Sequence, residues 1–407
     1  MSAVLQREID ELSAITSDPS PAVTRVLFSA EDIRARTWLR EKFVAAGLVV
    51  RQDAVGNIFA RWVGAEPELP AVATGSHTDA IPNAGKFDGV VGVLGALEAV
   101  RILQREGFRP RRSIEIIMFT AEEPTRFGIG CLGSRLLSGS IDAAAAADLR
   151  DTEGRSLDAL RNAAGCEGAV ESVRLPAGCY EAFLELHIEQ GPLLDREGID
   201  IGAVEKIAAP AAFRVRIEGE GGHAGAVLMP LRRDASLAAA ELALAVEQAA
   251  LESGSVDTVG TTGVIRIEPG AINSVPVRAL VEIDLRDTDL ETRARAELSI
   301  RAAIESISAR RRVDITIEVI NSDAPATCDP ELVAMICAAA QAHGCSVTRM
   351  ISRAYHDSLF MARLCPMAMI FIPCHNGWSH RPDEFASAES IAKGVAVLAA
   401  TLRNLSA

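Results

Sequence analysis

Several features that would connect this chain with a membrane or with nucleic acid are missing from its 407 residues. It contains no uncharged apolar run of about 18 residues or more, so it offers no candidate for a membrane-spanning helix. Lys and Arg number 41 against 55 Asp and Glu, which leaves a formal charge of −14, and the densest basic clusters, 109–113 and 309–313, are short. We therefore expect neither a membrane nor nucleic acid as a partner.

Disulfide and zinc-ribbon patterns are also missing. The eight cysteines are scattered without C-x-x-C spacing, and several lie within apolar segments. Such a distribution is typical of buried, reduced thiols in a cytoplasmic protein. The first 20 residues carry acids within their apolar periodicity and lack both a basic start and a continuous apolar stretch, so they predict an amphipathic helix rather than a signal peptide.

The length and composition are those of a globular protein with two domains. Apolar residues make up 49% of the chain and charged residues 24%, an ordinary balance. A chain of 407 residues is long for a single hydrophobic core.

The first half of the chain alternates helices and strands. Ser29 can cap a helix, which is followed by strands at about 48–53 and 57–63, a small-residue helix at 88–107 and a strand at 113–120. Because these strands are almost uniformly apolar, they predict an α/β fold with a parallel or mixed sheet covered on both faces.

Residues 209–324 predict a different order of elements, β-α-β-β-α-β, which is the signature of a ferredoxin-like α+β module. The earlier pattern resumes with a helix at 330–343, a buried strand at 367–373 and a closing helix. We therefore predict a discontinuous α/β domain formed by 1–208 and 325–407, with the module inserted between its two parts.

Five short polar segments carry the candidate functional residues. They supply three histidines, two acidic ligands and one further carboxylate, which is what two hydrolytic metal ions and a general base require. The segments are GSHTD at 75–79, FDG at 87–89, the tandem Glu122-Glu123, ELHIEQG at 185–191 and WSH at 378–380.

The expected geometry of the first segments suits metal binding. His77 ends an apolar strand, and Asp79, two residues on, points the same way and could orient the imidazole from behind. Asp88 has two carboxylate oxygens and could bridge cations about 3.5–4 Å apart. Glu122 and Glu123 follow a strand and project in different directions, so one can bind metal while the other faces water.

Each of these residues has a plainer explanation when it is considered alone. A histidine at a strand end is usually structural, Asp88 could cap a helix, and a Glu-Glu pair could be a charged turn. His187 in an apolar strand and His380 in a turn add two imidazoles to the same chain. The combination favours a metal site.

In their order along the chain these motifs resemble the hydantoinase/carbamoylase branch of the M20 metallopeptidase family, from about residue 25 to the end. The resemblance implies two divalent cations per subunit, manganese in preference to zinc or cobalt, with Glu122 as the general base. It assigns one cation to His77, Asp88 and His187, and the other to Asp88, Glu123 and His380.

Two longer segments narrow the expected substrate to a small ureido acid. EEPTRFGIGCLGSRLLSGS at 122–140 and ISRAYHDSLFMAR at 351–363 are similar to the members of this branch that hydrolyse (S)-ureidoglycolate to glyoxylate, ammonia and carbon dioxide. Allantoate, N-carbamoyl-L-amino acids and N-acyl amino acids are the nearest rival substrates. A catalytically inactive binding protein on the same fold is the alternative from another class.

The resemblance also implies substrate contacts and a homodimer. Gln190 and His356 match pocket positions of the outer domain, while His223, Asn273 and Arg286 lie in the module, which would act as a lid and dimerisation domain. His223 would donate to the oxyanion, and Arg286 would hold the substrate carboxylate bidentately with help from Asn273.

Each of these three residues of the module can also be explained by a structural role. His223 among glycines could be a turn residue, Asn273 could cap a turn, and Arg286 could pair with Asp284 or Asp287.

Overall fold

The computed structural model describes residues 3–407, so the first two residues of the predicted N-terminal helix lie outside the described part. The chain forms two compact units. The first contains the residues up to Glu205 together with Thr327–Ser352 and His356–Ala407. The second contains Lys206–Ala326 and the short segment Arg353–Tyr355.

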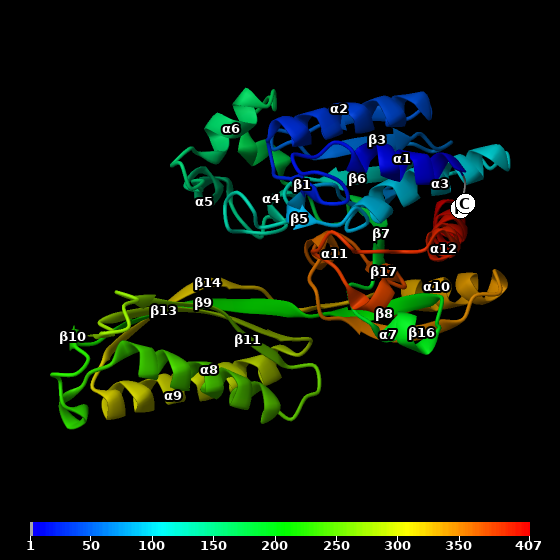
Figure 1. Ribbon diagram of the computed structural model, residues 1–407. Helices are drawn as coiled ribbons and strands as arrows, with labels where there is room; N and C mark the ends of the chain where they lie inside the picture. The colour runs from blue at the N-terminus through cyan, green and yellow to red at the C-terminus, as the bar shows by residue number, and fades with distance from the viewer. Residues whose placement is uncertain (1–2) are drawn as a thin grey trace. The chain divides into compact units, whose positions relative to one another are not determined.

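The first unit is built on a nine-stranded mixed sheet, as predicted (Figure 1). Its four central neighbours, β17, β7, β4 and β6, are parallel, and antiparallel strands flank them on both sides. A separate two-stranded ribbon pairs β1 with β5. The strands are β1 (Val23–Arg25), β2 (Val49–Gln52), β3 (Ile58–Trp62), β4 (Ala71–His77), β5 (Ala80–Ala84), β6 (Ile114–Phe119), β7 (Tyr180–Ile188), β8 (Ile201–Ile207), β15 (Ala326–Thr327), β16 (Val347–Ser352) and β17 (Met367–Ile372).

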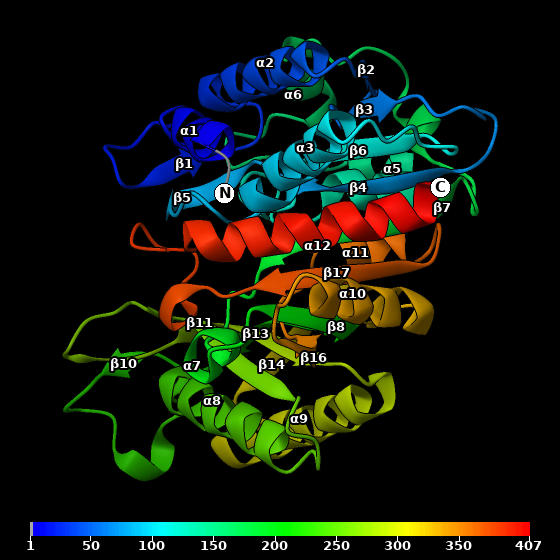
Figure 2. The ribbon, with the colours of Figure 1, turned by 90° about the vertical axis from the view of Figure 1, so that its right-hand side faces the viewer.

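Helices cover both faces of this sheet, which is why every residue of β4, β6 and β17 is buried. The helices α3, α12 and α10 lie side by side on one face (Figure 2), and α4 and α11 lie on the other. The helices are α1 (Ala3–Ser13), α2 (Ala30–Ala45), α3 (Val90–Arg105), α4 (Leu132–Ser138), α5 (Ala143–Ala147), α6 (Leu157–Ala163), α7 (Leu193–Glu197), α10 (Pro330–Ala342), α11 (Asp357–Met361) and α12 (Ala388–Ser406), with 3-10 turns η1 (Val170–Val173) and η3 (His375–Gly377).

The small residues of α3 allow this helix to approach the sheet very closely. A Cβ atom on Gly92 would lie 2.5 Å from the carbonyl oxygen of Leu186 in β7 and 2.6 Å from Cβ of Ser76 in β4. Only glycine fits such a contact without displacing the backbone. The start of α3 is thereby held beside the ends of β4 and β7.

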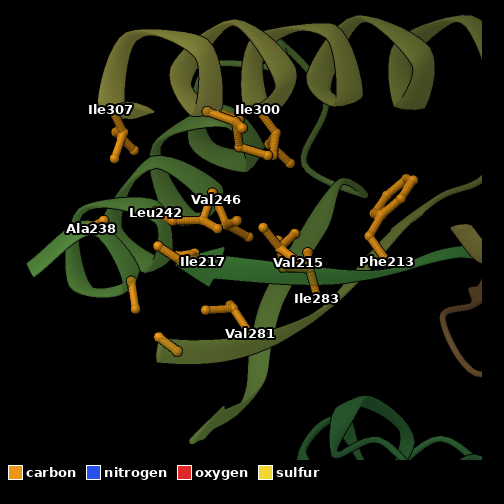
Figure 3. Packing of buried hydrophobic residues seen from close by; sticks show 14 of the residues in the cluster. Phe213, Val215, Ile217, Ala238, Leu242, Val246, Val281, Ile283, Ile300 and Ile307 are labelled. Atoms are coloured by element: carbon orange, nitrogen blue, oxygen red, sulfur yellow. The ribbon is translucent and has the colours of Figure 1, made fainter. Parts of the chain in front are cut away.

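The second unit has the predicted β-α-β-β-α-β order. Its sheet runs β11-β13-β9-β14, all antiparallel, and two helices pack on one face of it. Alternate residues of β9 and β13 point into this core, shown in Figure 3 with Phe213, Val215 and Ile283 among its members. The elements are β9 (Ala209–Glu218), β10 (Gly222–His223), η2 (Met229–Leu231), α8 (Ala235–Leu251), β11 (Val259–Glu268), β12 (Ser274–Val275), β13 (Arg278–Asp287), α9 (Leu290–Arg311) and β14 (Asp314–Ser322).

Two further expectations concern the whole described chain. All eight cysteines are free thiols, and six of them are buried, as the sequence predicted. Among residues 3–407, no helix combines the length and apolar character needed to cross a membrane.

Candidate metal centre

Four of the predicted functional segments leave the sheet at the same edge. The parallel strand β4 ends at His77, β7 ends one residue after His187, β6 ends three residues before Glu122, and β17 leads into the turn that carries His380. The carboxyl ends of neighbouring parallel strands lie side by side, and ligands of open α/β sheets bind there. Residues far apart in the sequence are brought together in this way.

Asp88 lies between two buried imidazoles. Its Oδ1 is 3.7 Å from Nε2 of His77 and 3.2 Å from Nε2 of His187. In each ring Nδ1 lies within hydrogen-bond distance of a backbone carbonyl, that of Asp79 at 3.0 Å and that of Ile188 at 2.8 Å. Because a carbonyl can only accept, Nδ1 donates, and Nε2 is the nitrogen that each ring presents to Asp88.

The other oxygen of Asp88 faces the third histidine. Oδ2 is 3.2 Å from Nε2 of His380, and the same nitrogen is 3.3 Å from Oε1 of Glu123. The His380 side chain is 47% exposed, whereas Asp88 and Glu123 are buried, so it forms the solvent side of the group. Asp88 therefore directs one oxygen toward His77 and His187 and the other toward His380.

These contacts define two sets of candidate ligands. In the first, His77, Asp88 and His187 offer donor atoms within 4.8 Å of one another, and in the second, Asp88, Glu123 and His380 do the same. Imidazole nitrogens and carboxylate oxygens without a thiolate suit zinc, manganese or cobalt. The described residues thus fit two divalent cations that share one carboxylate.

A third group of similar size, Glu185, His187 and His356, is less suited to a cation. Glu185 already accepts hydrogen bonds from the hydroxyl of Ser76 at 2.7 Å and from the backbone N–H and hydroxyl of Ser358 at 3.1 and 2.6 Å. Its lone pairs are directed at these donors, so Glu185 is explained as a buried carboxylate that ties β4, β7 and α11 together.

Glu122 diverges from its neighbour Glu123, as the strand geometry predicted. One of its oxygens lies 3.7 Å from Nε2 of His77, on the side of the first ligand set. The other accepts a weak hydrogen bond from the thiol of Cys131, whose Sγ is 3.5 Å away. Its carboxylate is therefore beside the candidate ligands without belonging to either set.

Asp79 holds both parts of the site through different atoms. Its carbonyl accepts from His77, and its carboxylate accepts the backbone N–H groups of Glu122 at 3.3 Å and Glu123 at 3.1 Å. Its carboxylate is 3.6 Å from Nδ1 of His77. Asp79 thus orients the histidine mainly by its backbone and fixes the tandem glutamates by its side chain.

The carboxyl groups of the site are crowded. Burial and the charges of Glu123, Asp357 and Asp88 raise the pKa of Glu122 well above its usual value. Burial and the charge of Asp88 raise the pKa of Glu123 to about 7. Burial would also raise the pKa of Asp88, but hydrogen bonds to the three histidines bring it well below its usual value.

The pKa values of the three imidazoles are raised as well. The hydrogen bond to Asp88 raises the pKa of His380 to about 9. Burial alone would lower the pKa of His77, but the charges of Glu122, Asp79 and Asp88 raise it well above its usual value. The group therefore attracts positive charge, which divalent cations supply when they are bound.

Gln190 lies at the edge of the second ligand set. Its backbone adopts a left-handed conformation with φ of 57°, and its Nε2 donates to Oδ2 of Asp88 at 2.8 Å. Its Oε1 is buried and has no hydrogen-bond partner among the described residues. A buried acceptor without a donor is costly, so this atom is well suited to receive an N–H or O–H of a ligand.

His356 is 2% exposed and stands behind the first ligand set. Its ring lies 4.5 Å from the ring of His187, and Nε2 is 3.0 Å from the hydroxyl of Ser352. The structure therefore brings His356 next to a candidate ligand, in a buried position.

The three predicted residues of the second unit do not lie together. His223 pairs with Ser274 in the β10–β12 ribbon, and the N–H of Ala224 donates to the carbonyl of Asn273 at 2.9 Å, so His223 and Asn273 are neighbours. Arg286 lies near the other end of β13. Its guanidinium pairs with Asp284 at 2.7 and 2.9 Å, which is the alternative considered from the sequence.

Two residues at the site were not predicted. Ser379 and Glu384 contact the segment of Asp88, and Glu384 is buried. The only available sign was the position of Glu384 four residues after His380, and an acid in a polar turn does not by itself indicate burial.

Known proteins are similar to this chain in sequence and in fold. A model of peptidase family M20/M25/M40 matches residues 73–404. The chain is 55% identical to the ureidoglycolate hydrolase of Arabidopsis thaliana, over 99% of this chain and 86% of that protein. It is 54% identical to the ureidoglycolate hydrolase of Oryza sativa subsp. japonica, over 99% and 84%. The crystal structure of AtUAH in complex with (S)-hydroxyglycine superposes with a TM-score of 0.92 and 54% identity, covering 99% of this chain and 97% of that one.

Proposed function

Because this chain belongs to peptidase family M20/M25/M40, we propose that it is an amidohydrolase that cleaves the ureido C–N bond of (S)-ureidoglycolate, yielding glyoxylate, ammonia and carbon dioxide. The observation that carries this proposal is the meeting of two ligand sets at Asp88 with Glu122 beside them. The choice of substrate is supported by 55% identity to a ureidoglycolate hydrolase over 99% of the chain.

Two divalent cations are assigned to the two ligand sets. His77, Asp88 and His187 would hold one, and Asp88, Glu123 and His380 the other, with manganese favoured and zinc or cobalt as alternatives. When bound, such cations lower the pKa of a water molecule toward neutrality and polarise a carbonyl group.

Glu122 is assigned the proton transfers. Its carboxylate stands beside the first ligand set and diverges from Glu123. Glu122 accepts a proton from the attacking water and donates it to the departing ammonia. The carbamate that remains loses carbon dioxide and a second ammonia to give glyoxylate, so one water and one ureidoglycolate account for all the products.

Gln190 and His356 are assigned to the substrate from the first unit. The unpartnered Oε1 of Gln190 would accept a hydrogen bond from the ureido group. His356 lies against His187 and would donate to the hydroxyl or carboxylate of the substrate.

The remaining substrate contacts are assigned to the second unit, which would act as a lid. His223 would donate to the oxyanion, Asn273 would assist, and Arg286 would bind the carboxylate in place of its present partner Asp284. At about 3.4 Å per residue, the eight steps along β13 from Arg278 to Arg286 span about 27 Å. A ureido acid is much shorter, so His223 and Arg286 of one chain cannot both touch it.

We therefore assign the enzyme as a homodimer in which His223 and Asn273 serve the site of a second copy. An apolar surface of the second unit is available for this association. Leu237, Leu244 and Leu251 recur every seven residues on α8 and are 38%, 66% and 75% exposed. They lie next to the edge strand β11, which exposes Ile265 on the same side of the sheet as α8. We call these four residues the α8–β11 surface.

The location proposed for the enzyme is the cytoplasm. All eight cysteines are free, and six of them are buried, which suits a reducing compartment.

The test is an assay of the purified protein, stripped of metal and reloaded with manganese, zinc or cobalt. Ureidoglycolate, allantoate and N-carbamoyl-L-amino acids are supplied in turn, and ammonia and glyoxylate are measured. We expect release of both from ureidoglycolate at the highest kcat/KM. Preference for allantoate or a carbamoyl amino acid would overturn the substrate, and inactivity on all of them with two cations bound would favour a binding protein.

A further inference from the structure

We propose that Glu384 is a positioning residue that fixes Asp88 relative to His380 and keeps Oδ2 of Asp88 available to a cation. This inference rests on the metal roles given under the proposed function and deepens them. Glu384 is 4% exposed and follows His380 by four residues, at the base of the same turn.

The carboxylate of Glu384 joins two segments that are almost 300 residues apart in the chain. Its Oε1 accepts the backbone N–H of Phe87 at 2.8 Å and that of Asp88 at 3.1 Å. Its Oε2 accepts the hydroxyl of Ser379 at 2.8 Å. One side chain therefore connects the backbone that carries Asp88 with the turn that carries His380, and these two residues belong to the second ligand set.

The hydroxyl of Ser379 can donate its hydrogen either to Glu384 or to Oδ2 of Asp88. Its Oγ is 2.8 Å from Oε2 of Glu384 and 3.1 Å from Oδ2 of Asp88, but a hydroxyl has a single hydrogen to donate. Nε2 of Gln190 lies 3.4 Å from the same Oγ and donates to it. While Glu384 accepts the hydrogen of Ser379, Oδ2 of Asp88 keeps a lone pair free for the second ligand set.

The Glu384 side chain packs directly against Gly85, where there is no room for another side chain. A Cβ atom built on Gly85 would lie 2.3 Å from Cβ and 2.4 Å from Oε1 of Glu384, so any side chain at this position would displace the carboxylate. Gly85 does not have a positive φ, so its glycine is explained by this contact rather than by backbone conformation. Gly85 and Glu384 thus form a pair that can be disturbed from either side.

Replacing Glu384 by glutamine reverses one hydrogen bond. The amide oxygen can still accept from Phe87 and Asp88, but the amide nitrogen donates to Ser379. The hydroxyl of Ser379 is then left to donate to Oδ2 of Asp88, where it competes with a cation. The first ligand set uses Oδ1 and is not affected directly.

The experiment measures manganese binding to metal-free protein by isothermal titration calorimetry, with stoichiometry checked by elemental analysis. For Glu384→Gln we expect affinity for the second cation to fall about 10–100-fold, the usual effect of removing an outer partner, while the first changes little. In the double variant Glu384→Gln, Ser379→Ala the competing hydroxyl is gone, so most of the lost affinity returns. Asp383→Asn, which removes a neighbouring exposed acid, is the matched control and should bind as the wild type does.

Every outcome of this experiment either supports the proposal or overturns it. Normal binding of both cations by Glu384→Gln, equal weakening of both, or no rescue by Ser379→Ala would overturn the proposal and leave Glu384 as a structural acid. If Glu384→Gln does not fold, as judged by the thermal transition of the metal-free protein, Gly85→Ala decides by the same selective loss. Wild-type protein that binds fewer than two cations would refute the proposed function itself.

Discussion

The carboxylate of Asp79 accepts the backbone N–H of Glu123 at 3.1 Å, 44 residues further along the chain. The same carboxylate accepts the N–H of Glu122, and the carbonyl of Asp79 accepts from His77. A single residue after β4 therefore sets the relative position of a candidate ligand and of the proposed general base. Fixed groups of this kind reduce the reorganisation that a reaction would otherwise require.

Asp79→Asn tests this relationship. An asparagine oxygen can accept one N–H of the tandem glutamates, but its amide group faces the other as a second donor. We expect cation affinity to fall about 10–100-fold, measured by metal content at buffered free manganese. Asp53→Asn is the control, since Asp53 accepts N–H groups of Val55 and Asn57 elsewhere in the unit. Equal metal content in both variants would remove Asp79 from this role.

Glu122→Gln tests the assignment of the general base. Because glutamine keeps the shape but cannot accept a proton, kcat should fall by about 10²–10⁴-fold or more while two cations stay bound. Initial rates of ammonia release and metal content are measured on the same preparation. Glu153→Gln, at an exposed position, is the control. A Glu122→Gln enzyme with wild-type kcat would contradict the role.

Leu244→Glu tests the α8–β11 surface. A charge at this exposed position does not disturb the fold, but it would be buried in the proposed interface at a large cost. We expect sedimentation to show a dimer for the wild type and a monomer for the variant, with activity lost because His223 and Asn273 no longer reach the other site. Leu298→Glu places the same change on α9, where Leu298 is 65% exposed, and should remain dimeric. Two variants that both stay dimeric would exclude this surface.

The environment of Tyr180, far from the metal centre, predicts that the stability of the fold depends on pH. Its hydroxyl donates to Glu115 at 2.5 Å, and burial together with the charge of Glu115 raises its pKa well above the usual 10.0. The unfolded chain loses the phenol proton first, so stability is complete below about pH 10 and falls as the pH rises toward the folded pKa, by up to about 1.4 kcal/mol per pH unit. Denaturant unfolding at several alkaline pH values should show this slope in the wild type. An identical slope in Tyr180→Phe would contradict the assignment.

Much of this fold could be predicted from local patterns. The apolar strands ending at His77 and His187 and the small-residue helix after Asp88 are recognisable because burial on both faces leaves uniform apolar runs. The order of elements in the second unit was equally visible. The short helices α4, α6 and α7 were not, because segments of five to seven residues carry too little periodicity.

The site could be predicted only as far as residue types allow. Candidate ligands were visible as histidines and acids at strand ends. The left-handed backbone of Gln190 and His380, with φ of 57° and 59°, and the contact of Glu384 with Asp88 depend on tertiary neighbours. For Arg286 the sequence offered both a substrate carboxylate and Asp284, and the structure shows the pair with Asp284.

The most direct test of the account is the number of manganese ions bound per chain in the wild type and in three variants. The shared position of Asp88 predicts two ions in the wild type, one in His187→Ala, one in His380→Ala and none in Asp88→Ala. Elemental analysis after equilibration at a fixed free manganese concentration supplies these numbers. An Asp88→Ala protein that keeps two ions, or a wild type that binds none, would contradict the claim that two cations meet at this residue.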